Sequence, residues 1–388
     1  YRGAFEGVRR DRPVLLVDQR GTGGSARLTC PESEDMLEEV PELEEIGPLV
    51  RECLDGLEAD PRYYTTSIAV RDLEAVRDAL GYPSLNLYGI SYGSRVAQQY
   101  LRRYPEHTRS VVLDGVIPAG KVLGPDIALF AQSAVDAIFA RCAESEACSA
   151  EFPDVEAEFA ALLERLARQP EAVSLIHPVT GAPAERRFSA DELAGAVRLL
   201  TYAPSSAALL PHLIHAGAQG NLAPLTAQIM MIEASMYESL AIGMHHSVVC
   251  AEDMPFVTEA DIDREALADT FMGAQQIDML REICRHWPRG PIDADFRAPL
   301  DTDVPVLLLS GEFDPVTPPA WGDLAAAQYD NARHVVGPGQ GHGLLPRGCT
   351  PRLVADFIAD ASVGELDADC VSRLGPMPFF LDFNGPQP

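Results

Sequence analysis

Three side chains that together can perform nucleophilic catalysis lie far apart in the chain, in the order Ser91, Asp314 and His342. A serine hydroxyl is a weak nucleophile at neutral pH, so it needs a base to take its proton. That base needs a carboxylate that orients it, and histidine with aspartate supplies both. These residue types predict acyl transfer through a covalent serine intermediate, provided that the fold brings them together.

Ser91 lies in the segment Gly89-Ile90-Ser91-Tyr92-Gly93, between a short apolar run at 84–90 and a helical pattern at 94–104. The segment matches G-x-S-x-G, a sharp strand-to-helix turn that exposes the serine hydroxyl. Glycines at both ends remove Cβ atoms that would collide in so tight a turn. The backbone N–H of Tyr92, at the helix N-terminus, is the predicted oxyanion donor. A glycine-rich turn without chemistry remains the alternative for this motif alone.

The predicted acid and base each follow a later strand. Asp314 comes after the apolar run "VLLLSGEF", and His342 lies in the glycine-rich loop "GPGQGHG" after "ARHVV". In a parallel sheet, functional groups meet at the carboxyl ends of the strands. Glu312 is an alternative acid, but the turn that begins at Pro315 favours Asp314 because it would hold that carboxylate rigidly. His334 lies within a strand between β-branched residues and is interpreted as structural.

Two further patterns raise the question of a metal or a cofactor. His212 and His215 are three residues apart on a predicted helix, and a pair of histidines occupies 245–246, but no acidic or cysteine partner stands at matching spacing. Residues 21–26 fit G-x-G-x-x-A after a predicted strand at 14–17, yet the helix that a dinucleotide site requires does not follow. We therefore predict no metal and no cofactor, and a tight turn beside the active-site cleft at 21–26.

The elements around these residues alternate in a regular way. A helix at 65–82, a strand at 84–90, a helix at 94–104 and a strand at 110–116 indicate a mostly parallel sheet with covering helices. The alternation stops at 121–300, where alanine-rich amphipathic segments follow one another at 126–142, 155–168, 190–201, 205–218, 222–240 and 262–284. Strands and a helix resume at 304, 332 and 351. The prediction is an α/β core at 1–120 and 301–388, with a helical insertion at 121–300 before the strand that carries the acid.

Composition limits the possible partners. The net charge of −28 disfavours nucleic acid and anionic membranes, and no run of 18 apolar residues exists. No signal peptide is visible, and the opening at Tyr1 suggests a mature or trimmed form. A peptide or small ester is the expected partner, and the oligomeric state is left open.

The eight cysteines bear on the cellular compartment. None forms C-x-x-C, and their even number suits disulfides in an oxidising compartment, so we predict a secreted or periplasmic protein. Of the 105 possible connectivities, pairing of sequence neighbours is favoured: 30–53, 142–148, 250–284 and 349–370. Eight reduced, buried thiols in a cytosolic protein are the alternative.

Taken together, these segments resemble a known family. "VLLVDQRGTGGS", "LNLYGISYGSRVAQQYLRRYPEHTRSVVLDGV", "SVVCAEDMPF" and "LLLSGEFDPVTPP" with "GQGHG" are similar to secreted bacterial serine exopeptidases over most of 8–360. These are the tripeptidyl aminopeptidase-like and proline iminopeptidase-like branch of the α/β-hydrolases. The resemblance implies an α/β-hydrolase fold with a helical cap, paired disulfides and release of single residues or tripeptides from peptide N-termini. A broad carboxylesterase and a catalytically impaired binding protein are the alternatives.

In one feature the sequence departs from that family. Its members carry an upstream "GGPG"-type loop that supplies a second oxyanion N–H, and residues 1–12, "YRGAFEGVRRDR", do not contain it. Losing one such donor costs about 10²–10³-fold in rate. The expectation is that the first strands of the sheet are missing because the numbered chain starts late, or that this version is catalytically impaired.

An aminopeptidase must also hold a free ammonium group at a fixed distance from its nucleophile. A partly buried carboxylate performs this task well, because a charge-assisted bond is strong in a cleft of low dielectric. The segment "HHSVVCAEDMPF" offers Glu252 and Asp253 beside Cys250. The family resemblance favours Glu252, and two solvated acids on the cap surface are the alternative.

Overall fold

A four-stranded parallel sheet forms the base of the molecule in the computed structural model, which describes residues 2–30 and 41–385. The strands β1 (Leu85–Ile90), β2 (Thr108–Asp114), β5 (Val306–Gly311) and β6 (Ala332–Gly337) lie in the order β1-β2-β5-β6. Every neighbouring pair is parallel. The apolar runs of β2 and β5 are buried almost throughout, as expected for central strands that are covered on both faces.

Alternate residues of these strands face two different layers of helices. Val111, Leu113 and Leu308 pack with α3 (Thr66–Ala79), α4 (Tyr92–Arg103) and α15 (Pro319–Ala326). Val112 and Leu307 pack on the other face with α16 (Thr350–Asp360) and the 3₁₀ turn at Arg2–Phe5. This alternation follows from the two-residue period of a strand. The α/β class and the parallel sheet that the sequence predicted are therefore present.

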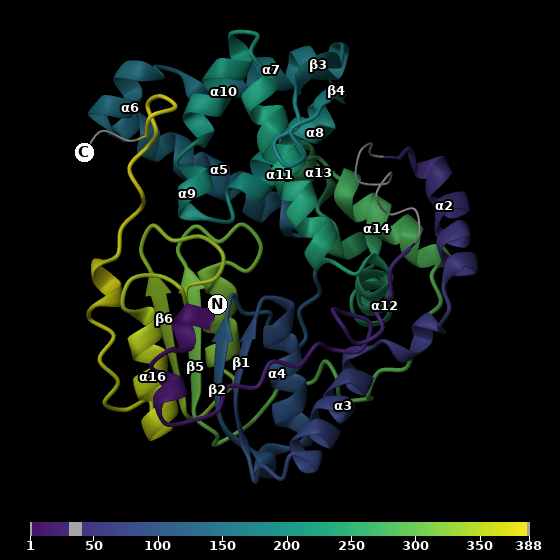
Figure 1. Cartoon of the computed structure of the whole chain (residues 1–388), viewed down its shortest axis with the longest axis vertical. Helices are drawn as coiled ribbons and strands as arrows, with labels where there is room; N and C mark the ends of the chain where they lie inside the picture. The colour runs from purple at the N-terminus through teal and green to yellow at the C-terminus, as the bar shows by residue number, and fades with distance from the viewer. Residues whose placement is uncertain (1, 31–40, 386–388) are drawn as a thin grey trace.

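A second, mostly helical layer lies between β2 and β5 in sequence and above the carboxyl ends of the strands in space (Figure 1). Its helices are α5 (Ile127–Glu144), α6 (Glu146–Glu151), α7 (Val155–Arg168), α8 (Ala190–Leu200), α9 (Pro204–Ala207), α10 (Leu210–Ala218), α11 (Ala223–Ser239), α12 (Ile242–Glu252), α13 (Arg264–Ala268) and α14 (Gln275–His286). The layer has its own apolar core, in which Phe159, Leu193 and Ile214 are buried. We call this layer, residues 127–286, the cap.

Two features of the cap region were not expected from the sequence. An antiparallel hairpin, β3 (Glu171–Ile176) with β4 (Pro183–Phe188), interrupts the helices, and its turn contains Gly181 in the left-handed region at φ 72°. The early helix α2 (Leu43–Gly56) packs with the cap rather than with the sheet, since Ile46 and Val50 share a core cluster with Ile277 and Ile283. A stretch of the chain far before the cap in sequence thus covers part of its core.

The predicted strand at 14–17 is wrong. Residues 13–19 have no regular secondary structure, and Leu15, Leu16 and Val17 are exposed, Leu16 to 70%. A strand forms only where a neighbour accepts and donates its backbone hydrogen bonds, and among the described residues no strand lies beside this segment. High β propensity without a pairing partner does not make a strand.

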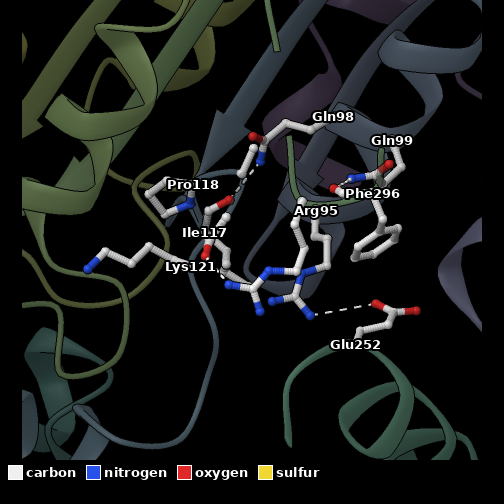
Figure 2. A pocket seen from close by; sticks show the side chains of 11 residues that line it. Arg95, Gln98, Gln99, Ile117, Pro118, Lys121, Glu252 and Phe296 are labelled. Atoms are coloured by element: carbon white, nitrogen blue, oxygen red, sulfur yellow. Dashed lines mark hydrogen bonds and ion pairs between the residues drawn. The ribbon is translucent and has the colours of Figure 1, made fainter. Parts of the chain in front are cut away.

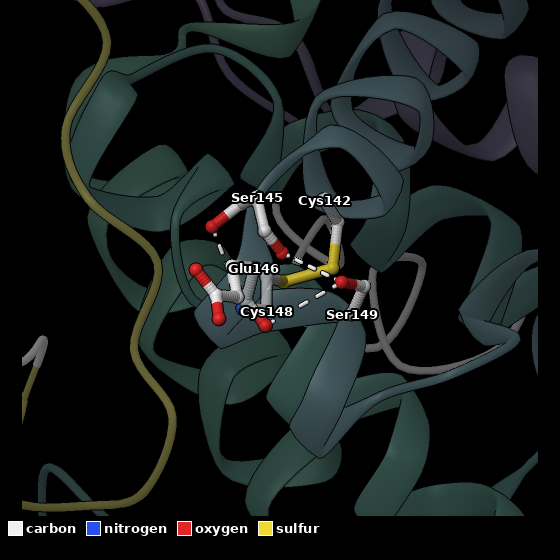
Figure 3. The surroundings of a disulfide bond; sticks show 5 residues. All are labelled: Cys142, Ser145, Glu146, Cys148 and Ser149. Atoms are coloured by element: carbon white, nitrogen blue, oxygen red, sulfur yellow. Dashed lines mark hydrogen bonds between the residues drawn. A yellow bond between two sulfur atoms is a disulfide. The ribbon is translucent and has the colours of Figure 1, made fainter.

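Four disulfides join the predicted sequence neighbours: Cys30–Cys53, Cys142–Cys148, Cys250–Cys284 and Cys349–Cys370. The nearest-neighbour pairing is therefore confirmed. Figure 3 shows the second bridge at the corner between α5 and α6, where Ser145 Oγ accepts the N–H of Cys148 and Ser149 Oγ donates to the carbonyl of Ser145. The bridge and the serine cap together fix the start of α6.

The Cys250–Cys284 bridge ties α12 to α14, and its removal tests how much the cap depends on it. A disulfide stabilises mainly by restricting the unfolded chain, and this one spans 34 residues, so Cys250→Ser with Cys284→Ser should cost roughly 2–4 kcal/mol of unfolding free energy. The double serine variant at Cys142 and Cys148 spans only 6 residues and should lose less. Thermal and denaturant unfolding measure both losses, and the reverse order of losses, or free thiols at Cys250 and Cys284 in the native protein, would contradict this account.

The chain beyond α16 connects the sheet region to the cap. The tail at 374–385 runs from the sheet region up along the cap (Figure 1), where Phe379 is buried in the cap core and Phe380 N donates to the carbonyl of Ala208. Lower down, Gln340 Nε2 donates to the carbonyl of Gly375. The tail therefore contacts both the cap and the loop that carries His342.

In the described part of the chain, no helix has the length and apolar character needed to cross a membrane.

Candidate active site

Ser91 lies at the tip of the predicted turn, directly between β1 and α4. Its backbone has φ 55° and ψ −123°, a conformation that a non-glycine residue rarely adopts. A Cβ on Gly89 would lie 2.1 Å from the carbonyl oxygen of Gly93, so only glycine fits that position. Such strain persists where the surrounding structure enforces it, and it is concentrated at functional sites. The turn places Ser91 at the N-terminus of α4, next to the backbone N–H of Tyr92.

Asp314 and His342 meet as the sequence predicted. Asp314 Oδ2 is 2.8 Å from His342 Nδ1, and the carboxylate is buried. Its other oxygen, Oδ1, accepts the backbone N–H groups of Val316 and Thr317 at 2.9 and 2.8 Å, while Thr317 Oγ1 donates to Oδ2. The turn after Pro315 therefore holds both oxygens in place, with one of them aimed at the imidazole.

The environment of His342 favours its charged form. Burial alone lowers the pKa of its imidazole, but the charge of Asp314 and its hydrogen bond outweigh burial, and Asp114 adds to the increase, so the net pKa is raised. A residue of the cap completes the setting: the Tyr202 carbonyl accepts the backbone N–H of His342, and the two rings meet edge to face at 5.3 Å. The cap thus contacts the predicted base directly.

The backbone that follows β2 brings the nucleophile turn close to this pair. Ser91 N donates to the carbonyl of Asp114 at 2.8 Å. The next residue, Gly115, has φ 63°, and a Cβ there would lie 2.9 Å from His342 Cε1. Within the described residues, Ser91 Oγ and His342 Nε2 do not form a hydrogen bond. Hydrogen bonds of this kind often form only when substrate is bound.

The alternative residues have other partners. Glu312 accepts the N–H of Gly339 and so supports the loop after β6, while His334 lies between Asp323 and Ser310. His215 contacts Glu158, whereas His246 is buried against the ring of Trp287. These contacts agree with structural roles for all of them.

Glu252 and Asp253 lie at the end of α12 and are both buried, so the alternative, that they are solvated acids on the cap surface, is wrong. Asp253 receives two hydrogen bonds from Arg95, at 2.7 and 2.9 Å, and a third from the N–H of Leu123. Glu252 accepts the N–H and the hydroxyl of Thr66 at 2.6 and 2.9 Å, at the N-terminus of α3. The carboxylate of Asp253 therefore accepts three hydrogen bonds, whereas that of Glu252 accepts two.

Glu252 is electrostatically unusual. The pKa of its carboxyl group is raised to about 7, because the effect of burial outweighs the opposing effects of the Arg95 charge and the hydrogen bonds from Thr66. Tyr92 Oη hydrogen-bonds the same Thr66 hydroxyl at 2.7 Å and also accepts from Gln19 Nε2. A chain of contacts thus leads from Ser91 through the adjacent tyrosine to Glu252. Sequence reasoning did not foresee the roles of Thr66 and Gln19.

A small pocket lies next to this network. Figure 2 shows the ion pair between Arg95 and Glu252, 3.6 Å apart, between α4 and the end of α12. Arg297 also lines the pocket and donates to the carbonyl of Gly120. Lys121, the only lysine of the chain, extends away from Glu252 (Figure 2). The pocket therefore combines one carboxylate with two guanidinium groups.

A serine on a strained strand-to-helix turn of a parallel sheet, with an aspartate–histidine pair after later strands, defines the α/β-hydrolase class. Comparison with known proteins agrees: residues 269–370 match the family model described as "TAP-like protein". The chain is 27% identical over 331 residues to "Putative hydrolase YuaR" of Escherichia coli (strain K12), covering 80% of this chain and 64% of that protein. It is 25% identical over 356 residues to the serine protease Hip1 of Mycobacterium tuberculosis (strain H37Rv), covering 85% of this chain and 67% of Hip1.

A more local match is 31% identity over 115 residues to the tripeptidyl aminopeptidase of Streptomyces lividans, 26% of this chain and 21% of that one. Among solved structures, a proline iminopeptidase from Mycobacterium smegmatis is similar with a TM-score of 0.37 and 17% identity, over 78% of this chain and 74% of that one. The chain therefore has an α/β-hydrolase fold and is similar to TAP-like proteins over residues 269–370, and the proteins that it resembles include a serine protease and an aminopeptidase.

Proposed function

We propose that the chain is a serine hydrolase in which Ser91 is the nucleophile, His342 the general base and Asp314 the orienting carboxylate. The observation that carries the proposal is the 2.8 Å bond from His342 Nδ1 to a buried carboxylate held in place by two backbone N–H groups. That bond keeps the proton on Nδ1 and leaves Nε2 free to accept the proton of a serine. The strained turn at Ser91, which is only partly buried, provides the hydroxyl on which this base would act.

The reaction follows from these positions. Ser91 Oγ attacks the substrate carbonyl carbon while His342 Nε2 takes the hydroxyl proton, and the oxyanion develops near the N–H of Tyr92. His342 then gives the proton to the leaving amine or alcohol, which departs and leaves an acyl-enzyme on Ser91. Water, deprotonated by the same histidine, hydrolyses the ester and restores the serine. The same histidine thus serves both steps. Asp314 stabilises the imidazolium form that His342 adopts in each of them.

The substrate that the site supports best is a peptide with a free N-terminus, from which short units are released. Glu252 is the proposed ammonium anchor, because it is a buried carboxylate near the nucleophile. Its own partners are Thr66, which donates two hydrogen bonds, and Arg95, which lies 3.6 Å away. Asp253 is assigned to hold Arg95 instead. Secretion or a periplasmic location accompanies this proposal, since four disulfides suit an oxidising compartment.

A carboxylesterase is the second candidate, and the pocket itself favours it. Arg95, Arg297 and Lys121 line the same pocket as Glu252, and three positive groups oppose the binding of an ammonium group. An N-blocked or uncharged acyl group would meet no such opposition. The two candidates therefore differ in how strongly a free amine is preferred.

Glu252→Gln separates these candidates, because it removes the negative charge and keeps the shape. For an aminopeptidase, KM for aminoacyl chromogenic substrates with a free amine should rise by about tenfold or more, while KM for their N-acetylated counterparts changes little. Steady-state kinetics on matched pairs of substrates measure both values. Glu185→Gln, which alters an exposed acid on β4, is the control.

Equal effects of Glu252→Gln on both substrate types would rule out Glu252 as the ammonium anchor and favour the esterase. Faster hydrolysis of the N-acetylated substrates by the wild-type enzyme would do the same. Neither result affects the assignment of the nucleophile, which is tested separately.

A further inference from the structure

Asp114, the last residue of β2, contacts both the nucleophile turn and the loop that carries the base. Its backbone carbonyl accepts the N–H of Ser91 at 2.8 Å. Its carboxylate is fully buried and accepts the N–H groups of Leu344 and Leu345, two and three residues after His342, at 2.7 and 2.9 Å. Asp114 therefore bonds both the turn that carries Ser91 and the loop that carries His342. The distance between these two segments decides whether Ser91 can transfer its proton to His342.

The remaining surroundings of Asp114 show that its carboxylate acts as an acceptor at both oxygens. Tyr88 Oη donates to Oδ2 at 2.9 Å, so Oδ2 receives two hydrogen bonds and Oδ1 receives one. Three donors converge on this group, and a neutral carboxyl would have to place its own proton against one of them. The hydrogen bonding thus suits a charged carboxylate, although burial raises the pKa of Asp114.

The charged groups around His342 come from several elements. Asp314 bonds its Nδ1 from the loop after β5, Asp114 acts from the end of β2, and Arg198 acts from α8 in the opposite sense. Tyr202 presents only a ring edge and a backbone carbonyl. Asp114 is thus a second anion near the imidazole, without a hydrogen bond to it.

We propose that Asp114 is a positioning residue that sets the distance between Ser91 and His342 and adds a second negative charge behind the imidazole. The inference rests on the proposed function of that site and extends it. Without this carboxylate, Leu344 and Leu345 lose their acceptors, the His342 loop is free to move from the turn, and the imidazolium loses part of its stabilisation.

Asp114→Asn tests the proposal, because it removes the charge and places an amide N–H₂ where acceptors are needed. We expect kcat to fall roughly 10- to 100-fold with KM changed less than about twofold, since alignment rather than binding is lost. The acid limb of the kcat/KM profile should move to lower pH by about half a unit or more, because losing an anion lowers the pKa of His342. If Asp114→Asn does not fold, Asp114→Ser carries the same test, since its hydroxyl accepts one N–H and leaves room for water.

Tyr88→Phe is the matched control, since it removes one hydrogen bond to the same carboxylate and keeps the charge. Tyr88→Phe should not shift the acid limb of the kcat/KM profile. Titration of the His342 imidazole by NMR in wild type and Asp114→Asn gives a readout independent of turnover, and a lower pKa in the variant is expected even if the proposed function fails. An unchanged pKa and pH profile in a folded variant, or failure of both the asparagine and serine variants to fold, overturns the proposal.

Discussion

Ser91→Ala is expected to abolish turnover, with kcat falling by about 10⁴-fold or more, while the protein stays folded. The loss is large because the hydroxyl forms the covalent bond, and the members of a triad act as a unit. The fold should survive, because alanine carries the same Cβ into the strained turn and, within the described residues, Ser91 Oγ makes no hydrogen bond. Hydrolysis of a chromogenic ester and thermal unfolding provide the two measurements.

Ser133→Ala is the matched control for that experiment, because Ser133 is an exposed serine of α5. It should retain full activity. Residual turnover of Ser91→Ala above about 1% of wild type would rule out Ser91 as the nucleophile, since losing a triad member costs several orders of magnitude.

Asp314→Asn is expected to lower kcat by about 10³- to 10⁴-fold with little loss of stability. The geometry explains why: Oδ1 is fixed by the N–H groups of Val316 and Thr317, so the asparagine carbonyl must occupy that position. Its N–H₂ group then faces His342 Nδ1 and donates to it. The imidazole is forced to carry its proton on Nε2, the atom that must accept the proton of Ser91.

Asp323→Asn is the control for this tautomer argument, because Asp323 makes the same kind of contact, 2.8 Å from His334 Nδ1, outside the site. Activity should be unaffected there. Stopped assays over a range of pH measure both variants, and a folded Asp314→Asn enzyme with more than about a tenth of wild-type kcat would contradict the orienting role.

Much of this site is predictable because its chemistry is carried by local signals. The G-x-S-x-G turn, the buried run before Asp314 and the glycine-rich loop around His342 each mark the carboxyl end of a strand. A parallel sheet brings such ends to one edge, and the structure joins Asp314 to His342 as predicted. The disulfides were predictable for a similar reason, since nearest neighbours in sequence close the shortest loops.

The predictions that failed depend on tertiary contacts, which a single sequence does not show. The run at 14–17 has strand propensity, but among the described residues it has no neighbouring strand, and Leu16 is 70% exposed. The burial of Glu252 and Asp253 comes with contacts to Thr66 of α3 and Arg95 of α4, which are distant in sequence. Asp114 was overlooked, although an aspartate at the end of the buried run "SVVLDGV" was the available signal.

The central claim, that Ser91 is the covalent nucleophile of this fold, is tested most directly by a fluorophosphonate probe. Wild-type protein is labelled, cleaved after arginine and analysed by mass spectrometry with fragmentation of the peptide 78–95, which contains Ser84, Ser91 and Ser94. The account predicts one adduct, on Ser91, that is absent from Ser91→Ala and strongly reduced in Asp314→Asn. An adduct on another residue, or no labelling of the folded wild-type protein, would contradict it.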